Sequence, residues 1–332
     1  MKNVVITGTE FFWGNRLLRS LISNTQIESI LALDTKKPDV HSDRLTSARL
    51  SYKPPFHFEW ADALERSNAD TLFLCPFSVD YCYHDNHASH LSGVQNSLRI
   101  LRKALEIQIP TIVVLSSFLI YGARWENPAF ITEDHLLLGD RNYQHIRGLI
   151  ELEEACLAAI ASSPSRSTIT ILRIVNAMGP GIQNSLSRYL QYPVIPTFLG
   201  FDPPLQLIYE TDVIDAMIWA AKYPETGAFN IAADGYLSLK EICAMLHKQT
   251  VPIFHGIMNF VGTGLWKSRL SEFSPAFLAM LRYRLILDLT RSKSILKFQP
   301  KWHIRNVVMS LTGADQSKTS RIMYTPADIP AQ

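Results

Sequence analysis

The sequence predicts an α/β fold in which helices cover both faces of a doubly wound parallel β-sheet. Two observations carry this prediction. Amphipathic segments with helical spacing separate short apolar runs. At 332 residues, 47% hydrophobic and 19% charged, the chain can also bury a large core. The expected strands are residues 4–6, 30–33, 57–62, 71–75 and 111–115, and the expected helices are residues 15–23, 89–107, 148–161 and 238–248.

Composition excludes several classes of function. A formal charge of +2 gives no basic surface for a nucleic acid. The four cysteines, Cys75, Cys82, Cys156 and Cys243, have neither disulfide-framework nor metal-ligand spacing, so we expect no metal site and a reducing, cytoplasmic location. The N-terminus does not resemble a signal peptide, and no uninterrupted run of about 18 apolar residues predicts a transmembrane segment.

The first fourteen residues are typical of a dinucleotide site. The β-forming run Val4-Val5-Ile6 leads into Thr7-Gly8, and a helix is expected to open near Gly14. A strand, a glycine turn and a helix start together present backbone N–H groups to a phosphate. The pattern Gly-x-x-Gly-x-x-Gly is incomplete, because its middle position is Phe11. The candidate cofactor-binding residues in this stretch are Gly8, Phe11, Phe12 and Gly14.

Two acidic residues extend this candidate site. Asp34 ends the second apolar run about 20 residues beyond the glycines, where a carboxylate can accept hydrogen bonds from both adenosine ribose hydroxyls. It would repel a 2′-phosphate, so NAD is the expected cofactor and not NADP. Asp62 ends the strand expected at 57–62, a position suited to an adenine amino group. The alternative interpretation of Asp34 is a residue of a turn that faces solvent.

Candidate catalytic residues follow the fifth apolar run. Ser116 and Ser117 end that run, and Tyr143 and Arg147 stand four residues apart near the start of a helix. Residues at i and i+4 share one helix face, and a cation beside a phenol lowers its pKa. The serine hydroxyl can hold a substrate oxygen while the tyrosine exchanges its proton.

In its ordered motifs, the chain resembles the extended short-chain dehydrogenase/reductases, specifically the NAD-dependent epimerase/dehydratase group and its UDP-glucose 4-epimerase-like members. The resemblance covers roughly residues 2–302. The motifs are Thr7-Gly8 to Gly14, Asp34, Asp62, Ser116–Gly122, Tyr143 with Arg147, residues 171–180, 207–216 and 227–231, and residues 295–302.

The resemblance implies roles for individual residues. Ser117 would bind the substrate carbonyl or hydroxyl, and Tyr143 would be the general acid and base. Arg147 stands where the family has a lysine that bonds the nicotinamide ribose, so it is a candidate for catalysis and cofactor binding. Asn176 matches a residue that contacts the diphosphate of a nucleotide sugar. Arg188 is a candidate substitute for arginines that this family usually carries near residues 205–206 and 294; Arg291 and Lys293 are others.

The resemblance also implies a domain plan, in which a smaller, interleaved C-terminal lobe accompanies the Rossmann sheet and binds substrate. We expect an NAD-binding Rossmann domain over 1–176, the start of the substrate lobe over 177–205, a return to the sheet over 206–234, and the lobe with closing helices over 235–302. Residues 303–332 form a tail that lacks periodicity and is expected to be partly disordered. The apolar stretch 253–287 is either lobe core with a subunit contact, or a face for a membrane surface or a partner protein.

Three functions remain open. The first is an NAD-dependent epimerase or dehydratase that moves a hydride between a UDP-hexose-like nucleotide sugar and bound NAD, with proton transfer by Tyr143. The second is an NAD(P)-dependent reductase or dehydrogenase of another carbonyl or hydroxyl compound. The third is a non-catalytic dinucleotide-binding protein, which the residues Phe11 and Arg147 would favour. A homodimer is expected only from the habit of the family.

Overall fold

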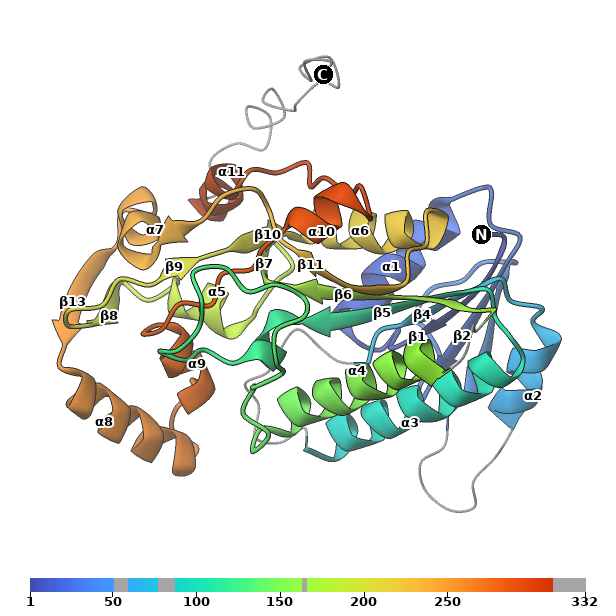
Figure 1. Ribbon diagram of the computed structural model, residues 1–332, viewed down its shortest axis with the longest axis horizontal. Helices are drawn as coiled ribbons and strands as arrows, with labels where there is room; N and C mark the ends of the chain where they lie inside the picture. The colour runs from blue at the N-terminus through green and yellow to red at the C-terminus, as the bar shows by residue number, and fades with distance from the viewer. Residues whose placement is uncertain (51–58, 77–86, 163–165, 313–332) are drawn as a thin grey trace, which may run out of the picture.

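The computed structural model describes residues 1–50, 59–76, 87–162 and 166–312. Its centre is a seven-stranded, entirely parallel sheet with the strand order β11-β6-β5-β4-β1-β2-β3 (Figure 1). The strands are β1 (Asn3–Thr7), β2 (Ser29–Asp34), β3 (Leu45–Arg49), β4 (Thr71–Leu74), β5 (Thr111–Ser117), β6 (Thr168–Ile174) and β11 (Gly227–Ile231).

Helices cover both faces of this sheet, as the alternation of apolar runs and amphipathic segments predicts. On one face α1 (Phe12–Ser23) packs beside α6 (Glu210–Lys222), and α2 (Glu59–Arg66), α3 (His87–Glu106) and α4 (Gln144–Ser162) pack together on the other (Figure 1). Within β1, Val4 and Ile6 face the first layer and Val5 the second, because successive side chains of a strand point to opposite faces. Both faces are therefore buried, as in other parallel sheets.

The strand predicted over 57–62 is wrong. Residues 51–58 lie outside the described part of the chain, and Glu59 begins helix α2, whose Trp60 and Leu64 are buried one turn apart. The third strand of the sheet is instead β3, which pairs with β2 from Leu45 to Arg49. It is an edge strand with no fully buried residue, so it lacks the apolar run by which the other strands are recognised.

The remaining elements form a lobe beyond the carboxyl ends of the strands (Figure 1). Three two-stranded sheets build it, from β7 (Asn176–Met178) with β10 (Leu207–Tyr209), β8 (Val194–Phe198) with β13 (Gln249–Ile253), and β9 (Pro204–Leu205) with β12 (Leu237–Ser238). Its helices are α5 (Ser185–Tyr189), α7 (Leu239–Met245), α8 (His255–Lys267), α9 (Pro275–Met280) and α11 (Ile304–Met309). Helix α10 (Thr290–Ser294) instead contacts β11 and lies beside α6 (Figure 1). Short 3₁₀ turns span η2 (Phe118–Tyr121) and η3 (Ser310–Thr312).

The C-terminal part of the chain is tied back to the end of the sheet. The side chain of Gln206 bonds the backbone of Leu287 twice, donating to its carbonyl oxygen at 3.1 Å and accepting from its N–H at 2.7 Å. Leu287 also bridges Ile131, and Asn230 Nδ2 donates to the carbonyl of Asp288. Order extends past Trp302 as well, because α11 buries Val307 and Val308. Residues 304–312 of the expected tail are therefore helical, and residues 313–332 lie outside the described part of the chain.

Candidate functional site

Two glycines allow β1, its following turn and α1 to pack closely. Gly8 has φ +69°, and a Cβ there would lie 1.9 Å from the carbonyl oxygen of Cys75, just beyond β4. A Cβ on Gly14 would lie 2.1 Å from the carbonyl oxygen of Gly8. These contacts involve backbone atoms that a side chain cannot push aside. The turn therefore lies directly between the carboxyl ends of β1 and β4, where the strand connections change direction and ligands of such sheets bind.

Phe11 does not distort this turn. It is the N-cap residue of α1 with φ −97° and ψ 160°, an extended conformation open to any residue, and its N–H donates to the carbonyl of Gly8 at 2.9 Å. No side chain caps α1, and its first turn carries no acidic residue, so the positive end of the helix is available to an anion. The ring of Phe12 packs edge-on against Trp13, and the guanidinium of Arg16 lies 5.3 Å from the Phe12 ring centre.

Asp34 fixes the same turn from β2. The carboxylate is buried; Oδ2 accepts from Thr9 Oγ1 at 3.0 Å and from the Glu10 N–H at 3.1 Å, and Oδ1 accepts from the Thr35 N–H at 2.8 Å. Oδ1 keeps a second lone pair that a ribose hydroxyl could use. Burial and the neighbouring Asp34 raise the pKa of Glu10. Two carboxyl groups at this point disfavour a 2′-phosphate, as the sequence predicts.

The residues around this turn fit a bound NAD. A glycine cradle that a Cβ would fill, an uncapped helix start and the Asp34 carboxylate lie together at the carboxyl edge of the sheet. Asp62 does not join them. It lies on an exposed face of α2 and not at a strand end, because the expected strand is a helix.

Ser116 and Ser117 end β5 and are both fully buried. Ser116 Oγ donates to the carboxylate of Glu153 on α4, so this hydroxyl already has a buried hydrogen-bond partner. Ser117 is the N-cap of η2, and its Oγ accepts from the N–H of Leu119 at 3.3 Å. The structure therefore places Ser117 at the carboxyl edge, where the sequence predicts it.

Tyr143 and Arg147 are not brought together. Tyr143 precedes the first residue of α4, so the i, i+4 spacing does not align the two side chains, and the ring of Tyr143 turns toward Trp266 and α9. The N–H of Ala276 donates a hydrogen bond to the Tyr143 hydroxyl. Arg147 Nε lies 3.8 Å from Glu151 Oε1 on the outer side of α4. Burial first, and Asp140 second, raise the pKa of Tyr143 to about 12. The predicted lowering of this pKa by Arg147 is wrong for this conformation.

Helix α9 links Tyr143 to Asn176. Asn176 is buried on β7, and its Nδ2 lies 3.4 Å from the sulfur of Met280 at the end of α9. Between η2 and α9 lies a cavity of about 340 Å³. Its lining includes Leu119, Gly122, Asp140, Ala276 and Met280. The cavity therefore has the partners of Ser117, Tyr143 and Asn176 in its walls.

The candidate substrate cations are engaged within the protein. Arg188 Nε lies 2.9 Å from Glu272 Oε2, and the Arg188 side chain is largely buried. Arg291 pairs with both oxygens of Asp134, and Lys293 Nζ lies 2.5 Å from Asp234. At the other expected arginine positions, Gln206 holds the backbone of Leu287, and Ser294 Oγ donates to the carbonyl of Thr290.

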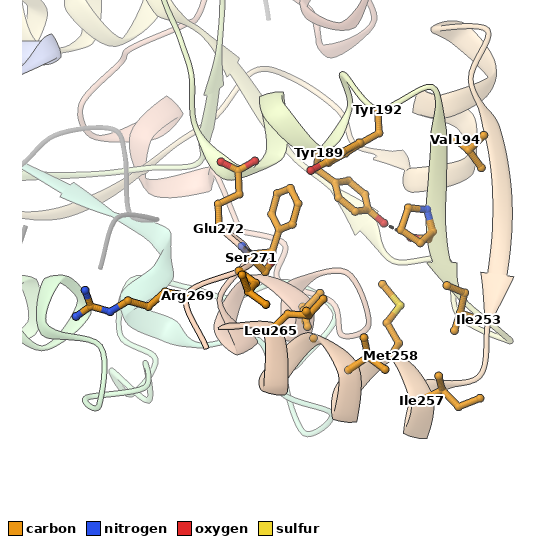
Figure 2. A pocket seen from close by; sticks show the side chains of 16 residues that line it. Tyr189, Tyr192, Val194, Ile253, Ile257, Met258, Leu265, Arg269, Ser271 and Glu272 are labelled. Atoms are coloured by element: carbon orange, nitrogen blue, oxygen red, sulfur yellow. Dashed lines mark hydrogen bonds between the residues drawn. The ribbon is translucent and has the colours of Figure 1, made fainter. Parts of the chain in front are cut away.

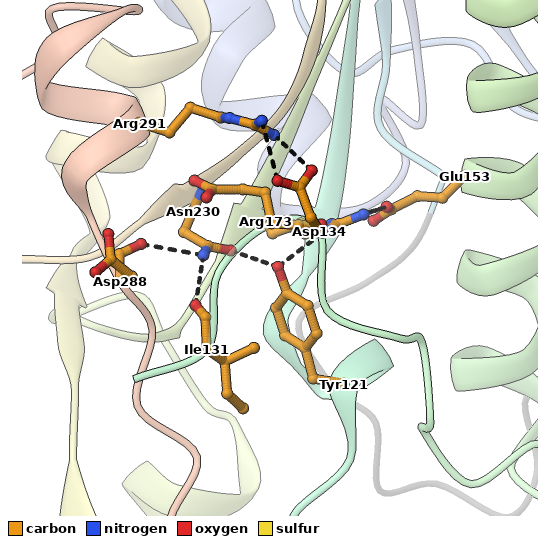
Figure 3. Close-up of polar contacts among 9 residues, drawn as sticks. Tyr121, Ile131, Asp134, Glu153, Arg173, Asn230, Asp288 and Arg291 are labelled. Carbon is orange, nitrogen blue, oxygen red and sulfur yellow. Dashed lines mark hydrogen bonds and ion pairs between the residues drawn. The ribbon is translucent and has the colours of Figure 1, made fainter. Parts of the chain in front are cut away.

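A buried polar network escaped the sequence analysis. Arg173 on β6 pairs with Glu153 on α4 and donates to Tyr121 Oη at 2.7 Å, and Tyr121 in turn donates to Asn230 Oδ1 at 2.7 Å (Figure 3). Asn230 Nδ2 donates to the carbonyls of Ile131 and Asp288. The available signal was an arginine inside the apolar run 169–175, because a charge there must find a buried partner.

Two features of the described residues bear on other functions. No helix in them is long and apolar enough to cross a bilayer. Nor do they contain a group of three or more histidine, cysteine, aspartate or glutamate side chains arranged to hold a metal ion.

Solved structures with the same architecture include proteins in complex with UDP-sugars or NAD. MoeE5 in complex with UDP-glucuronic acid and NAD superposes with a TM-score of 0.68 at 17% identity, covering 96% of this chain and 99% of that one. UDP-glucose 4-epimerase of Thermotoga maritima with UDP-glucose gives 0.65 at 16% identity, covering 94% and 97%. UDP-glucuronic acid 4-epimerase of Bacillus cereus with NAD gives 0.65 at 14% identity, covering 93% and 97%.

Sequence comparisons place the chain in a family. An uncharacterized protein of Mycobacterium tuberculosis is 27% identical over 317 residues, which covers 91% of this chain and 81% of that protein. The model of the NAD dependent epimerase/dehydratase family matches residues 4–232. The resemblance drawn from the motifs, the parallel-sheet architecture and NAD as the cofactor are confirmed. The chain belongs to the NAD dependent epimerase/dehydratase family.

Proposed function

We propose that this protein is an NAD-dependent enzyme that oxidises and reduces a sugar carbon of a UDP-hexose-like nucleotide sugar, as an epimerase or a dehydratase. One observation carries the proposal. The fitted dinucleotide cradle at Gly8, Gly14 and Asp34 lies on the same edge of one sheet as the hydroxyl of Ser117. This arrangement on strands β1, β4 and β5 supports a cofactor site and a substrate-binding hydroxyl at one edge of the sheet.

Different groups of the chain would bind different parts of NAD. The N–H groups in the first turn of α1 would bond the pyrophosphate, which approaches over Gly8 and Gly14. Asp34 Oδ1 would accept from the adenosine ribose. Arg147, on the outer side of α4 here, stays a predicted contact of the nicotinamide ribose. When bound, NAD supplies a hydride acceptor and, in its oxidised form, a positive charge.

Ser117 and Tyr143 would both contact the substrate hydroxyl. Ser117 Oγ would hold the substrate oxygen, and the Tyr143 hydroxyl would take up and return its proton. The phenol has a pKa of about 12 here, so proton transfer near neutral pH requires a cation close to it. The substrate would enter the cavity beside η2 and α9, where Asn176 is a predicted diphosphate contact. Arg188 would contact the diphosphate by exchanging its partner Glu272.

Specific observations favour the other two functions. Gln206 and Ser294 occupy positions where arginines would clamp a diphosphate, which favours a reductase or dehydrogenase of a different carbonyl compound. The outward position of Arg147 and the raised pKa of Tyr143 favour a dinucleotide-binding protein without catalysis. The relatives crystallised with NAD and UDP-sugars support the first function over both.

The deciding experiment identifies ligands and then tests turnover. Mass spectrometry of the purified protein should detect retained NAD, and incubation with UDP-hexoses should produce an epimer or a dehydrated sugar. Tyr143→Phe should lower turnover by about 100-fold to 10,000-fold, whereas Tyr223→Phe, an exposed phenol at the end of α6, should leave it unchanged. Undiminished turnover in Tyr143→Phe would overturn the proton-transfer role. Net NADH consumption by a non-nucleotide carbonyl would favour the reductase. Thermal stabilisation by NAD without any turnover would favour the non-catalytic dinucleotide-binding protein.

A further inference from the structure

A cavity of about 830 Å³ lies between helix α8 and the strands β8 and β13 (Figure 2). Ile257, Val261 and Leu265 line it from α8, and Val194 lines it from β8. The apolar stretch 253–287 is thus divided, because α8 borders this space whereas the later residues are lobe core. The buried residues of that later part include Phe277, Leu278, Leu281 and Leu285.

Helix α8 packs closely on α9 and leaves the cavity open beside it. A Cβ on Gly262 would lie 2.4 Å from Leu278 Cδ1, so the glycine lets the two helices approach each other. Within the cavity, Ile257 is 59% exposed, Val261 47% and Leu265 40%, because no described side chain fills the space. A ligand that entered would remove this apolar surface from water, which is favourable.

The apolar lining runs along the helix. Ile257, Val261 and Leu265 follow one another at intervals of four residues, so they share one side of α8 and extend over about 12 Å of its axis. On the opposite wall, Val194 and Pro196 are alternate residues of β8, whose side chains point to the same side of the strand. Two aliphatic walls therefore face each other along most of the helix, which suits an extended, chain-shaped ligand.

An aromatic cluster forms the wall toward the lobe core. The ring centre of Tyr189 lies 5.6 Å from that of Phe273 and 5.4 Å from that of Phe277. Tyr189 Oη donates to the carbonyl oxygen of Pro196, so its single donor is already used. Tyr189 therefore adds apolar surface to the cavity and no donor for a ligand.

Polar side chains lie at one end of the cavity. Arg269, Ser271 and Glu272 follow the last turn of α8, and in Figure 2 they lie on the side opposite to Val194. Glu272 Oε2 lies 2.9 Å from Arg188 Nε. Ser271 Oγ accepts from a backbone N–H at 3.1 Å, and a hydroxyl that accepts can still donate its own proton. A ligand with one polar end and an apolar remainder matches this distribution.

We propose that this cavity binds a single aliphatic chain, straight or isoprenoid, whose polar head lies beside Ser271 and Glu272. Its volume falls within the range of about 300–1,000 Å³ that is usual for small-molecule sites. The cavity and the candidate site lie on opposite sides of α9, because Leu278 lines the cavity and Ala276 lines the space beside η2. Binding of the chain is therefore separate from the proposed enzymatic function.

Displacement of a fluorescent aliphatic probe from the full chain tests the proposal. Dansyl-labelled undecanoic acid should bind at one site per chain, with increased and blue-shifted emission. Unlabelled dodecanol, dodecanoate and farnesol should displace it, and the most effective of them identifies the type of chain and head. Along the alcohols from hexanol to dodecanol, each added methylene should tighten binding by up to about fourfold.

Variants that fill the cavity should weaken binding. Val261→Trp from α8 and Val194→Trp from β8 should each raise the dissociation constant of the probe by about tenfold or more. Both side chains are more than 40% exposed, so the variants should fold, which circular dichroism and the NAD-induced thermal shift check. Phe260→Ser is the matched control on the same helix. Phe260 is 83% exposed and is not among the described residues that line the cavity, so this variant should bind the probe as the wild type does.

Three outcomes would overturn the proposal. They are no saturable binding of the probe, binding that is unchanged in both tryptophan variants, and displacement of the probe by UDP-glucose, which would make the cavity part of the substrate site. Light scattering adds a decision, since a dimer that dissociates in Val261→Trp, without any probe binding, would assign the cavity to a second copy of the chain. Turnover of UDP-hexoses in a protein that does not bind the probe would refute this proposal and leave the proposed function intact.

Discussion

The guanidinium of Arg173 and the carboxylate of Glu153 form an ion pair of 2.6 Å in which both side chains are only 1% exposed. The pair joins β6 to α4 across the interface that also holds Ser116. Two buried charges this close offset each other's loss of hydration, and the bonds to Tyr121 and Ser116 satisfy their remaining polar atoms. The network fixes how Ser116 at the end of β5 meets α4, the helix that follows Tyr143.

Breaking this pair from one side should be costly. Arg173→Met leaves the Glu153 carboxylate buried without its cation, and the free energy of unfolding should fall by about 3–5 kcal/mol. Arg173→Met/Glu153→Leu should recover part of that loss. Urea unfolding measures both. Arg141→Met is the control, because the Arg141–Glu154 pair is about half exposed and should be worth less than about 1 kcal/mol. Equal losses in the buried and surface variants would contradict this account.

Gly14→Ala should separate α1 from the glycine turn. The new Cβ would lie 2.1 Å from the backbone oxygen of Gly8, so we expect a loss of about 1–3 kcal/mol in stability and of the thermal shift produced by NAD. Gly264→Ala on α8 is the matched control, since nothing lies within 4 Å of its added Cβ. It should raise stability by about 0.5–1 kcal/mol. Retained NAD binding in Gly14→Ala would refute the assignment of the cradle.

Tyr143 should titrate far above neutrality in the free protein. Burial holds the phenol in its neutral form, so the difference in tyrosinate absorbance between wild type and Tyr143→Phe should have its midpoint near pH 12. Because the folded pKa is raised, the stability that this group contributes is lost as the pH rises from about 10 to about 12.

The same titration tests Arg147. Arg147→Ala should leave the midpoint unchanged, since Arg147 contacts Glu151 and not the phenol. Addition of NAD should lower the midpoint if the cofactor brings a positive charge to the ring. A rise of the midpoint in Arg147→Ala would show that the arginine acts on Tyr143 after all.

Asp212 predicts a dependence of stability on pH. This carboxyl at the start of α6 is fully buried, and burial raises its pKa to about 6 although the N–H groups of Trp302 and Lys301 donate to it. The folded state thus prefers the neutral form, so Asp212 contributes stability below pH 4 that is lost as the pH rises through about 6. The loss should approach about 3 kcal/mol.

Urea unfolding of wild type and Asp212→Asn measures this dependence. The amide does not titrate, so the wild type should lose stability relative to the variant between pH 4 and pH 7. Parallel pH profiles of the two proteins would disprove the assignment to Asp212.

The central sheet was predictable because its strands carry their own signals. The runs at 4–6, 30–33, 71–75 and 111–115 are apolar on both faces, and only helices on both sides can cover such strands. Edge strand β3 lacked this signal, because half of its surface meets solvent. Trp60 and Leu64 are spaced for a helix, but the neighbouring aromatic residues suggested a strand.

The candidate site was predictable only where backbone geometry determines it. Gly8, Gly14 and Asp34 act through a turn that local sequence dictates, and the structure brings them together. Whether Arg147 lies beside the phenol of Tyr143 depends on the residue at which α4 begins. It also depends on the backbone N–H of Ala276 on α9, which donates to the phenol. Residues 275–280 lie more than 130 positions away in the sequence, so no local pattern shows that contact. Glu153 and Arg173 likewise become partners only when helix and strand pack.

Two hydrogen bonds from the Gln206 side chain to the Leu287 backbone tie the part of the chain that matches the family model to a segment beyond it. The family model ends at residue 232, yet Gln206, Ile131 and Asn230 all complete their hydrogen bonds on residues 286–288. A fragment cut at residue 232 would leave these polar groups unsatisfied in its interior and expose the apolar side of β10 and β11. Residues 286–288 therefore complete the hydrogen bonds at the carboxyl end of the sheet. Most of the chain must be synthesised before this part of the fold can take its final shape.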